Sequence, residues 1–271
     1  MTLIDMGVNL MNSAFDRDRD DVVRSAKAAG VSPLIITGSS AESSRRAQEY
    51  AATHSSGAGK LFSTAGFHPH NAKTWETGSA ETLRSLALHS EVVAIGECGL
   101  DYNRDFSPRD KQRFCFEAQI ALAAELNLPL FLHERDAFDD FSAILQNNLT
   151  NIKRMAVHCF TGTERELEKY LELGAWIGIT GWICDERRGS HLIPLVKRIP
   201  ADKLLLETDA PYLMPRNMAG AKRNGRNESR YLVHIAEFIA EILEKAPAQI
   251  AAETFTNTCV FFDLPASTAS L

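Results

Sequence analysis

Short runs of apolar residues recur along this chain, and most are followed by a longer segment whose apolar positions are spaced three or four residues apart. A short apolar run predicts a buried strand, and the wider spacing predicts a helix with one buried face. The pattern predicts strands over residues 3–10, 32–38, 61–68, 92–97, 128–133, 155–158, 175–182 and 203–209. It predicts helices over residues 16–30, 41–54, 79–90, 107–127, 137–147, 163–173, 191–198 and 228–244, and a last helical segment over residues 247–258.

Eight strands that alternate with eight helices predict a parallel sheet, because a helix is the usual right-handed crossover between parallel strands. Eight such units close most simply into a (β/α)8 TIM barrel, and 271 residues suit the length of that fold. We therefore expect residues 1–271 to form a single α/β domain. An open doubly wound sheet is the alternative, and it would scatter the strand ends along an edge.

Four of the predicted strands end in side chains that bind metal ions in proteins, namely Glu97, His133, His158 and Asp209. In a barrel the carboxyl ends of all strands share one mouth, so these side chains would converge there. Two imidazoles and two carboxylates suit Mg²⁺, Mn²⁺ or Zn²⁺, with water completing the coordination. Either histidine alone could equally be a core residue bonded to a backbone carbonyl. Four such strand ends together favour a metal site.

Other polar side chains near the predicted mouth are candidates for substrate binding. His68 and His70 flank a proline at the end of the third strand, which makes them weaker candidates for substrate contacts. Phosphate binding needs positive charge, and an arginine cluster follows the seventh and eighth strands: Arg187, Arg188, Arg216, Arg223, Arg226 and Arg230. For any one of these arginines, a solvated surface position is the commoner case. We predict Arg223 and Arg226 as phosphate contacts whose joint neutralisation flattens the salt dependence of activity.

Composition and charge narrow the classes of function. The formal net charge of −6 disfavours a protein that coats long duplex DNA with a broad basic face, but it allows a local basic groove. Five cysteines without a CxxC pair indicate neither a disulfide framework nor a thiolate zinc site. The sequence shows no signal peptide and no apolar run of about 18 residues, so we expect a cytoplasmic monomer with no membrane contact.

Several segments resemble, in the right order, the successive motifs of the TatD family of metal-dependent deoxyribonucleases: GFHPH (66–70), AIGECGLDY (94–102), LFLHERDA (130–137), VHCFTG (157–162), GITGW (178–182) and LLLETDAPYL (205–213). The resemblance covers nearly the whole chain and is strongest to the bacterial TatD branch. It implies a TIM barrel of the amidohydrolase type that hydrolyses phosphodiester bonds. For close relatives it implies a magnesium-dependent 3′-5′ exonuclease that trims single-stranded DNA or RNA.

The resemblance also implies a role for each strand-end residue. Glu97 matches the metal-bridging carboxylate, and His133 and His158 match the metal-binding histidines. Asp209 matches a metal ligand and general base. The implied cofactor is Mg²⁺, for which Mn²⁺ can substitute, and Zn²⁺ is a further candidate.

The first predicted strand departs from the pattern of many family members. Those members begin with an Asp-x-His-x-His motif whose histidines bind metal, whereas this chain has Asp5, Gly7 and Asn9 at the matching positions. The bacterial branch looks the same there, so the departure does not exclude nuclease activity. It favours a labile ion such as Mg²⁺ over two tightly held zinc ions. We expect histidines at positions 7 and 9 to raise zinc affinity if they fit.

Three functions from different classes therefore follow from the sequence. The first is the exonuclease, and the second is a metal-dependent amide or ester hydrolase that acts on a small molecule. The arginine-rich loops favour the phosphate substrate of the first function. The third is a barrel that has lost catalysis and serves as a binding partner, which the intact set of Glu97, His133, His158 and Asp209 opposes.

Overall fold

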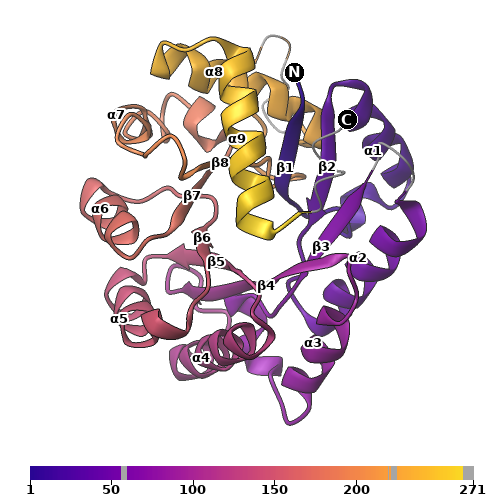
Figure 1. Cartoon of the computed structure of the whole chain (residues 1–271), viewed down its shortest axis with the longest axis vertical. Helices are drawn as coiled ribbons and strands as arrows, with labels where there is room; N and C mark the ends of the chain where they lie inside the picture. The colour runs from indigo at the N-terminus through magenta and orange to yellow at the C-terminus, as the bar shows by residue number, and fades with distance from the viewer. Residues whose placement is uncertain (56–59, 219, 221–224, 265–271) are drawn as a thin grey trace.

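Eight parallel strands form one sheet in sequential order in the computed structural model, which describes residues 1–55, 60–218, 220 and 225–264. The strands curve into a ring (Figure 1). Their bounds are β1 Leu3–Val8, β2 Val31–Ile36, β3 Leu61–Ala65, β4 Val92–Asp101, β5 Leu130–Arg135, β6 Met155–Val157, β7 Trp176–Ile179 and β8 Leu204–Leu206. This arrangement confirms the predicted TIM barrel and excludes the open doubly wound sheet.

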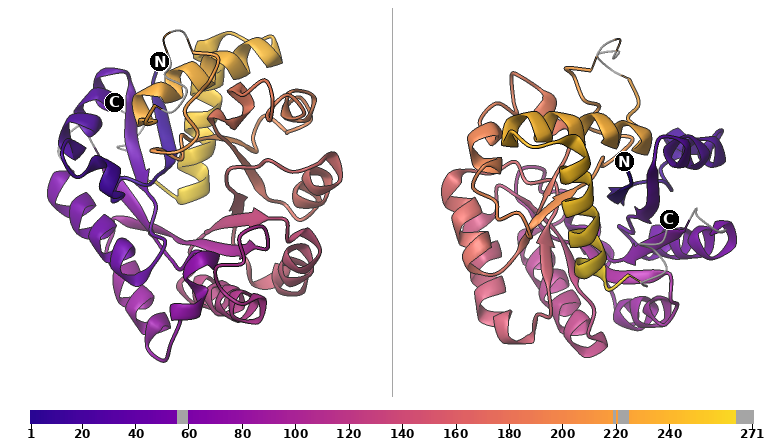
Figure 2. Two further views of the ribbon diagram at one scale, coloured as in Figure 1. Left: turned by 180° about the vertical axis from the view of Figure 1, so that it is seen from behind. Right: turned by 45° about the horizontal axis from the view of Figure 1, so that its top comes forward.

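Helices α1 to α8 surround the ring on its outer side, as Figure 2 shows from two further directions, and α9 lies across one end of it. Their bounds are α1 Arg19–Ala28, α2 Ala41–His54, α3 Ser79–Ala87, α4 Arg109–Leu126, α5 Phe138–Asn148, α6 Glu164–Glu172, α7 Leu192–Val196, α8 Leu232–Leu243 and α9 Pro247–Phe262. Short 3-10 turns, η1 Ser13–Phe15, η2 Pro69–Thr74, η3 Leu149–Asn151, η4 Gly181–Cys184 and η5 Ser229–Tyr231, lie in the connections. Within the described residues, none of these helices has both the length and the apolar character needed to cross a bilayer.

Several strands end two or three residues earlier than their apolar runs predict. The strand β8 ends at Leu206, and the following residues form a loop whose amide groups bond to neighbouring chain segments. The amide of Glu207 donates to the carbonyl of Ile179 (3.2 Å), and that of Asp209 donates to Gly7 (2.9 Å). The chain at the mouth is therefore held by hydrogen bonds that a sequence pattern does not reveal.

The seam between β8 and β1 closes the ring. The amide of Asn9 donates to the carbonyl of Ala210 (2.8 Å), and the buried carboxylate of Asp5 accepts hydrogen bonds from both the amide (2.9 Å) and the hydroxyl (2.6 Å) of Thr208. Burial raises the pKa of Asp5 to about 6, although the hydrogen bonds from Thr208 oppose this shift. Asp5 of the first strand thus holds Thr208, the residue directly before Asp209, in place.

Two apolar layers hold the barrel together. One fills the space between the strands and the outer helices, and the other fills the ring, where Met6, Phe62 and Phe131 meet. Phe261 and Phe262 of α9 belong to this inner layer, and α9 crosses one end of the ring (Figure 1). Each fully buried side chain of this size contributes roughly 1.5–3 kcal/mol. The inner layer makes the ring a packed core, so chemistry is confined to the mouth at the carboxyl ends of the strands.

Candidate active site

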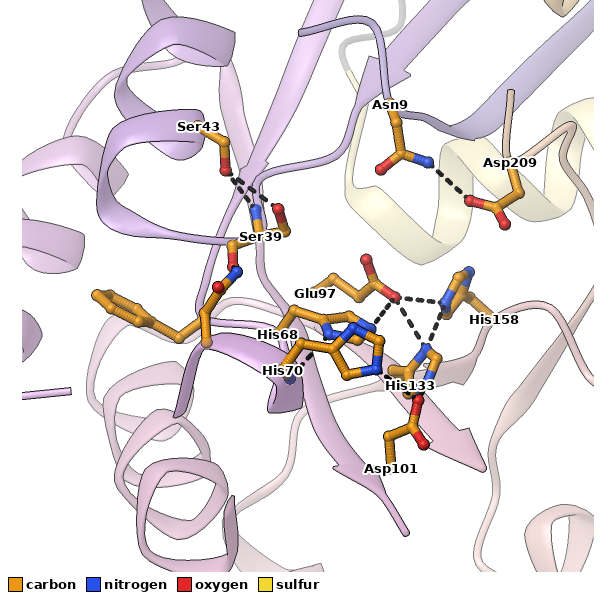
Figure 3. A network of polar contacts seen from close by, with 12 residues as sticks. Asn9, Ser39, Ser43, His68, His70, Glu97, Asp101, His133, His158 and Asp209 are labelled. Carbon is orange, nitrogen blue, oxygen red and sulfur yellow. Dashed lines mark hydrogen bonds and ion pairs between the residues drawn. The ribbon is translucent and has the colours of Figure 1, made fainter. Parts of the chain in front are cut away.

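The carboxylate of Glu97 lies at the centre of a group of three histidines (Figure 3). Its Oε1 atom is 2.8 Å from Nε2 of His158, 3.0 Å from Nδ1 of His133 and 3.4 Å from Nε2 of His68. Burial alone would raise the pKa of Glu97, but the three histidines outweigh burial and hold it well below its usual range. Glu97 therefore stays ionised and offers a permanent negative charge.

The carboxylates of Asp101 and Glu207 contact two of these histidines through the ring nitrogen that faces away from Glu97. His133 places its Nε2 atom 3.4 Å from Oδ2 of Asp101, and His158 places its Nδ1 atom 3.4 Å from Oε2 of Glu207. Burial would lower the pKa of both histidines, but the carboxylates around them raise it. Carboxylates in this position fix the orientation of metal-binding histidines in proteins and make them better ligands.

Glu207 also fills the space beside Gly7. A Cβ atom added to Gly7 would lie 2.5 Å from Oε2 of Glu207 and 3.1 Å from the ring of Phe131, both closer than real Cβ atoms normally approach. The opposite oxygen of Glu207 accepts a hydrogen bond from the amide of Cys159 at 2.5 Å. A histidine at position 7 would therefore fit only if the buried carboxylate of Glu207 moved, so its effect on zinc affinity stays a prediction.

Asp209 lies beside Asn9, at the end of the group away from His70 and Asp101 (Figure 3). Its Oδ1 atom accepts a hydrogen bond of 2.7 Å from the side-chain amide of Asn9. Burial raises the pKa of Asp209 to about 7, with His158 opposing the shift and Glu97 adding to it. Its φ of +54° is a left-handed conformation that few aspartates adopt, and such backbone is concentrated at functional sites.

His68 and His70 form the third side of the group. The Nδ1 atom of His68 accepts a hydrogen bond from the amide of His70 (3.1 Å), which leaves the proton on Nε2, the atom that points to Glu97. Burial lowers the pKa of His68 to about 4, so this imidazole is neutral. The Nε2 atom of His70 bonds to Asp101 at 2.7 Å. His68, Glu97 and His133 place ligand atoms within 4.8 Å of one another.

A cavity of about 570 Å³ opens above these side chains. Its wall brings together all six predicted residues of strands β3 to β8, namely His68, His70, Glu97, His133, His158 and Asp209, and adds Asn9, Trp182, Arg188 and Tyr212. Trp182 and Tyr212 thus lie where stacking on a substrate is feasible. The convergence of these residues confirms their expected meeting at one mouth; their roles stay predictions.

The structure does not place the two predicted arginine contacts, Arg223 and Arg226, on the described cavity wall. Arg223 lies outside the described residues. Arg226 forms ion pairs with Asp18 (2.6 Å) and Glu228 (2.8 Å), and its guanidinium lies 4.9 Å from the ring centre of Phe15. It is absent from the described wall of the cavity. These contacts favour a structural role for Arg226, whose guanidinium joins the loop after β8 to the start of α1, and its contact with substrate stays a prediction.

Two residues of the site, Asp101 and Glu207, escaped the sequence analysis. Both lie at the carboxyl ends of apolar runs, and Glu207 is two residues before Asp209. The position of Glu207 at the end of an apolar run could therefore have identified it as a candidate site residue. The sequence could not show that one carboxylate would face His158 while the other bonded to Asn9.

A (β/α)8 barrel with buried carboxylates and histidines gathered at its mouth is the architecture of a metal-dependent hydrolase. A model of the family described as TatD related DNase matches residues 4–263. This chain therefore belongs to the TatD-related DNase family.

Curated relatives align with nearly the whole chain. A 3'-5' ssDNA/RNA exonuclease TatD of a Pantoea species (strain At-9b) is 50% identical over 262 residues, which are 97% of this chain and 100% of the relative. A protein of the same name from a Rahnella species (strain Y9602) is 49% identical and covers 97% of this chain and 99% of its own length.

Solved structures agree with the family assignment. The TatD homologue YJJV of Escherichia coli superposes with a TM-score of 0.87 at 27% identity, over 97% of this chain and 98% of its own. A TatD family hydrolase of Entamoeba histolytica gives a TM-score of 0.85 at 27% identity, with the same coverage of both chains.

Proposed function

We propose that this protein is a metal-dependent exonuclease that hydrolyses phosphodiester bonds from the 3′ ends of single-stranded DNA or RNA. The observation that carries the proposal is the convergence of one Glu97 oxygen with nitrogen atoms of three histidines at the barrel mouth. The exonuclease names of relatives about 50% identical over 97% of the chain support the substrate class.

The donor set fits a divalent metal ion. Glu97 stays ionised among the histidines, and His68, Glu97 and His133 place ligand atoms within 4.8 Å of one another, so the site holds buried donors that a cation would satisfy. We assign the ion to Glu97, His133, His158 and Asp209. When bound, such an ion polarises a phosphate oxygen and lowers the pKa of a coordinated water. The lack of first-strand histidines favours a labile ion, Mg²⁺ or Mn²⁺, over zinc.

Asp209 is placed to accept the proton of the attacking water. A carboxylate at the cavity wall beside the proposed ion can take a proton from a water that the ion activates. The amide of Asn9 donates to one carboxylate oxygen and so leaves the other free for this task. Proton transfer by a positioned side chain typically contributes about 10²–10⁴ in rate.

His68 is placed to donate a hydrogen bond to the substrate. Because its Nδ1 atom accepts from the chain, Nε2 carries the proton and points into the group around Glu97. This geometry favours His68 as a donor to a phosphate or leaving oxygen over a metal ligand. All the residues assigned here come from one barrel, so a single chain should suffice for activity, which light scattering alongside the assay would test.

A metal-dependent amide or ester hydrolase would use the same donors. Arg104 and Arg135 on the cavity wall, which have no ion pair within the described part of the chain, favour the phosphodiester because they supply positive charge that an uncharged amide does not need. To test the proposal, strands labelled at the 5′ or 3′ end are incubated with Mg²⁺, Mn²⁺ or Zn²⁺ and with EDTA. A 5′-labelled ladder of shortening products and prompt release of a 3′-labelled mononucleotide are expected. Hydrolysis of amide or ester panels without nuclease activity would contradict the proposal.

A further inference from the structure

An exposed phenylalanine stands at the rim of the cavity. Phe106 lies in the loop between β4 and α4, and 56% of its surface is exposed. Its ring centre is 4.7 Å from that of His70, in an edge-to-face arrangement, and His70 lines the cavity. The ring thus continues the wall of the active site while leaving most of its surface open to solvent.

The loop that carries Phe106 is firmly held. The hydroxyl of Ser107 donates to the carbonyl of His70 (2.9 Å) and accepts from the amide of Lys73 (3.0 Å). The ammonium of Lys73 donates to the carbonyl of Phe106 (3.1 Å). An aromatic ring fixed in this way loses little conformational entropy when another flat group stacks on it.

Two arginines on the same side of the mouth are available for binding. Arg104 and Arg135 line the cavity near the ends of β4 and β5, where Arg135 pairs with Asp101 in the strand register. Among the residues that the structure describes, neither guanidinium has an ion pair or a hydrogen bond. Other arginines nearby are neutralised, including Arg109 by Asp105 and Arg188 by Asp185.

We infer that Phe106, Arg104 and Arg135 form a binding surface for the single strand, on which a base stacks against Phe106 while the two arginines bind backbone phosphates. This inference rests on the proposed function and deepens it. Stacking on an aromatic ring tolerates any base, and arginines beside it track the backbone, which suits an enzyme that must accept every sequence. The surface is continuous with the cavity through His70, so a bound strand leads directly to Glu97.

The chain offers a matched control for each part of this surface. Phe114 is a phenylalanine of α4 that is equally open, with 61% exposed, but it does not line the described cavity. Arg109 is an arginine close in sequence to Arg104 whose guanidinium is held by Asp105 at 2.8 Å. Substitutions at these positions remove the same chemical groups without touching the proposed surface.

The experiment measures KM and kcat of the wild-type protein and its variants on a short 5′-labelled oligothymidine with Mg²⁺. Phe106→Ala should raise KM roughly tenfold, Phe106→Trp should restore it, and Phe114→Ala should have no effect. The double change Arg104→Gln with Arg135→Gln should reduce the slope of log(1/KM) against log salt by about 1.4, and Arg109→Gln should leave the slope unchanged.

The outcomes separate this inference from the proposed function. If the wild-type protein does not degrade the strand at all, the proposed function fails. If it does, but Phe106→Ala behaves like Phe114→Ala and the double arginine variant keeps the wild-type salt slope, the binding surface is wrong while the exonuclease stands. A melting temperature equal to that of the wild-type protein, measured for every variant, verifies that the changes do not act through folding.

Discussion

The carboxylate of Glu207 occupies the space that a side chain at position 7 would need, since a Cβ atom on Gly7 would come within 2.5 Å of its Oε2 atom. The same oxygen lies 3.4 Å from Nδ1 of His158. Glycine at position 7 therefore makes room for this carboxylate, and the carboxylate in turn contacts His158. The space that a first-strand side chain would otherwise fill is taken by a carboxylate that contacts His158, a proposed metal ligand.

A direct prediction concerns histidine substitutions in the first strand. Gly7→His should destabilise the protein and leave zinc affinity unchanged, because the imidazole would collide with Glu207 and Phe131. Asn9→His should raise zinc affinity, since Asn9 lines the cavity and already contacts Asp209. Zinc titration by calorimetry measures both effects. A Gly7→His protein that folds normally and binds zinc more tightly would show that Glu207 moves aside.

Glu97 and Asp209 should be essential for activity but not for folding. Glu97→Gln and Asp209→Asn should each lower kcat by at least about a hundredfold, because the first removes the central negative charge and the second the proton acceptor. Both should also abolish the rise in melting temperature that Mg²⁺ or Mn²⁺ produces in the wild-type protein. Glu42→Gln, on the exposed face of α2, is the control. Retained metal-dependent stabilisation in the Glu97 variant would exclude that residue as a ligand.

Arg226 should matter for stability and not for substrate binding. Arg226→Ala should lower the free energy of unfolding by about 1–2 kcal/mol, because it removes a partly exposed double ion pair and a contact with Phe15. KM for single strands and its salt dependence should not change. Arg230→Ala, which removes a more exposed pair with Glu228, should cost less. A flattened salt dependence in the Arg226 variant would return this arginine to the binding surface.

The seam carboxylate of Asp5 should make stability depend on pH. Its pKa is about 6 in the folded protein against an ordinary value of 3.8, so the folded state holds its proton more tightly than the unfolded state does. The stability that Asp5 contributes is therefore largest at low pH and falls as pH rises through 4 to 6, by about 3 kcal/mol in total.

Asp5→Asn should remove this pH dependence. The difference in unfolding free energy between wild type and variant, measured by urea denaturation in EDTA, should shift in favour of the variant by about 2 kcal/mol between about pH 4 and about pH 7. A difference that stays constant over this range would mean that Asp5 has the same pKa in the folded and the unfolded protein.

The sequence predicted the fold well because its information is periodic. Each apolar run buried in the barrel has a helix behind it, and Ala41–His54 was predicted to the residue since Ser40 caps it and the apolar spacing continues to its end. Several strand ends were predicted too late, as at Leu206, and those of β4 and β5 too early, because backbone hydrogen bonds rather than hydrophobicity decide where pairing stops.

The site was predicted as far as position on a strand determines it. Glu97, His133, His158 and Asp209 were found because each ends an apolar run, and a barrel brings such ends together. The arginine contacts could not be found this way. Whether a guanidinium is free, like that of Arg104, or occupied, like that of Arg226, depends on carboxylates that come from distant parts of the chain.

The bonds between Asp5 and Thr208 join positions 203 residues apart in the chain. Contacts between such distant positions form late in folding, because the intervening loop must be closed first. A growing chain that has reached only β7 lacks Thr208 and Asp209, so Asp5 has no partner for these bonds. The proposed proton acceptor is therefore made after Glu97, His133 and His158, and a partly made chain holds an incomplete site.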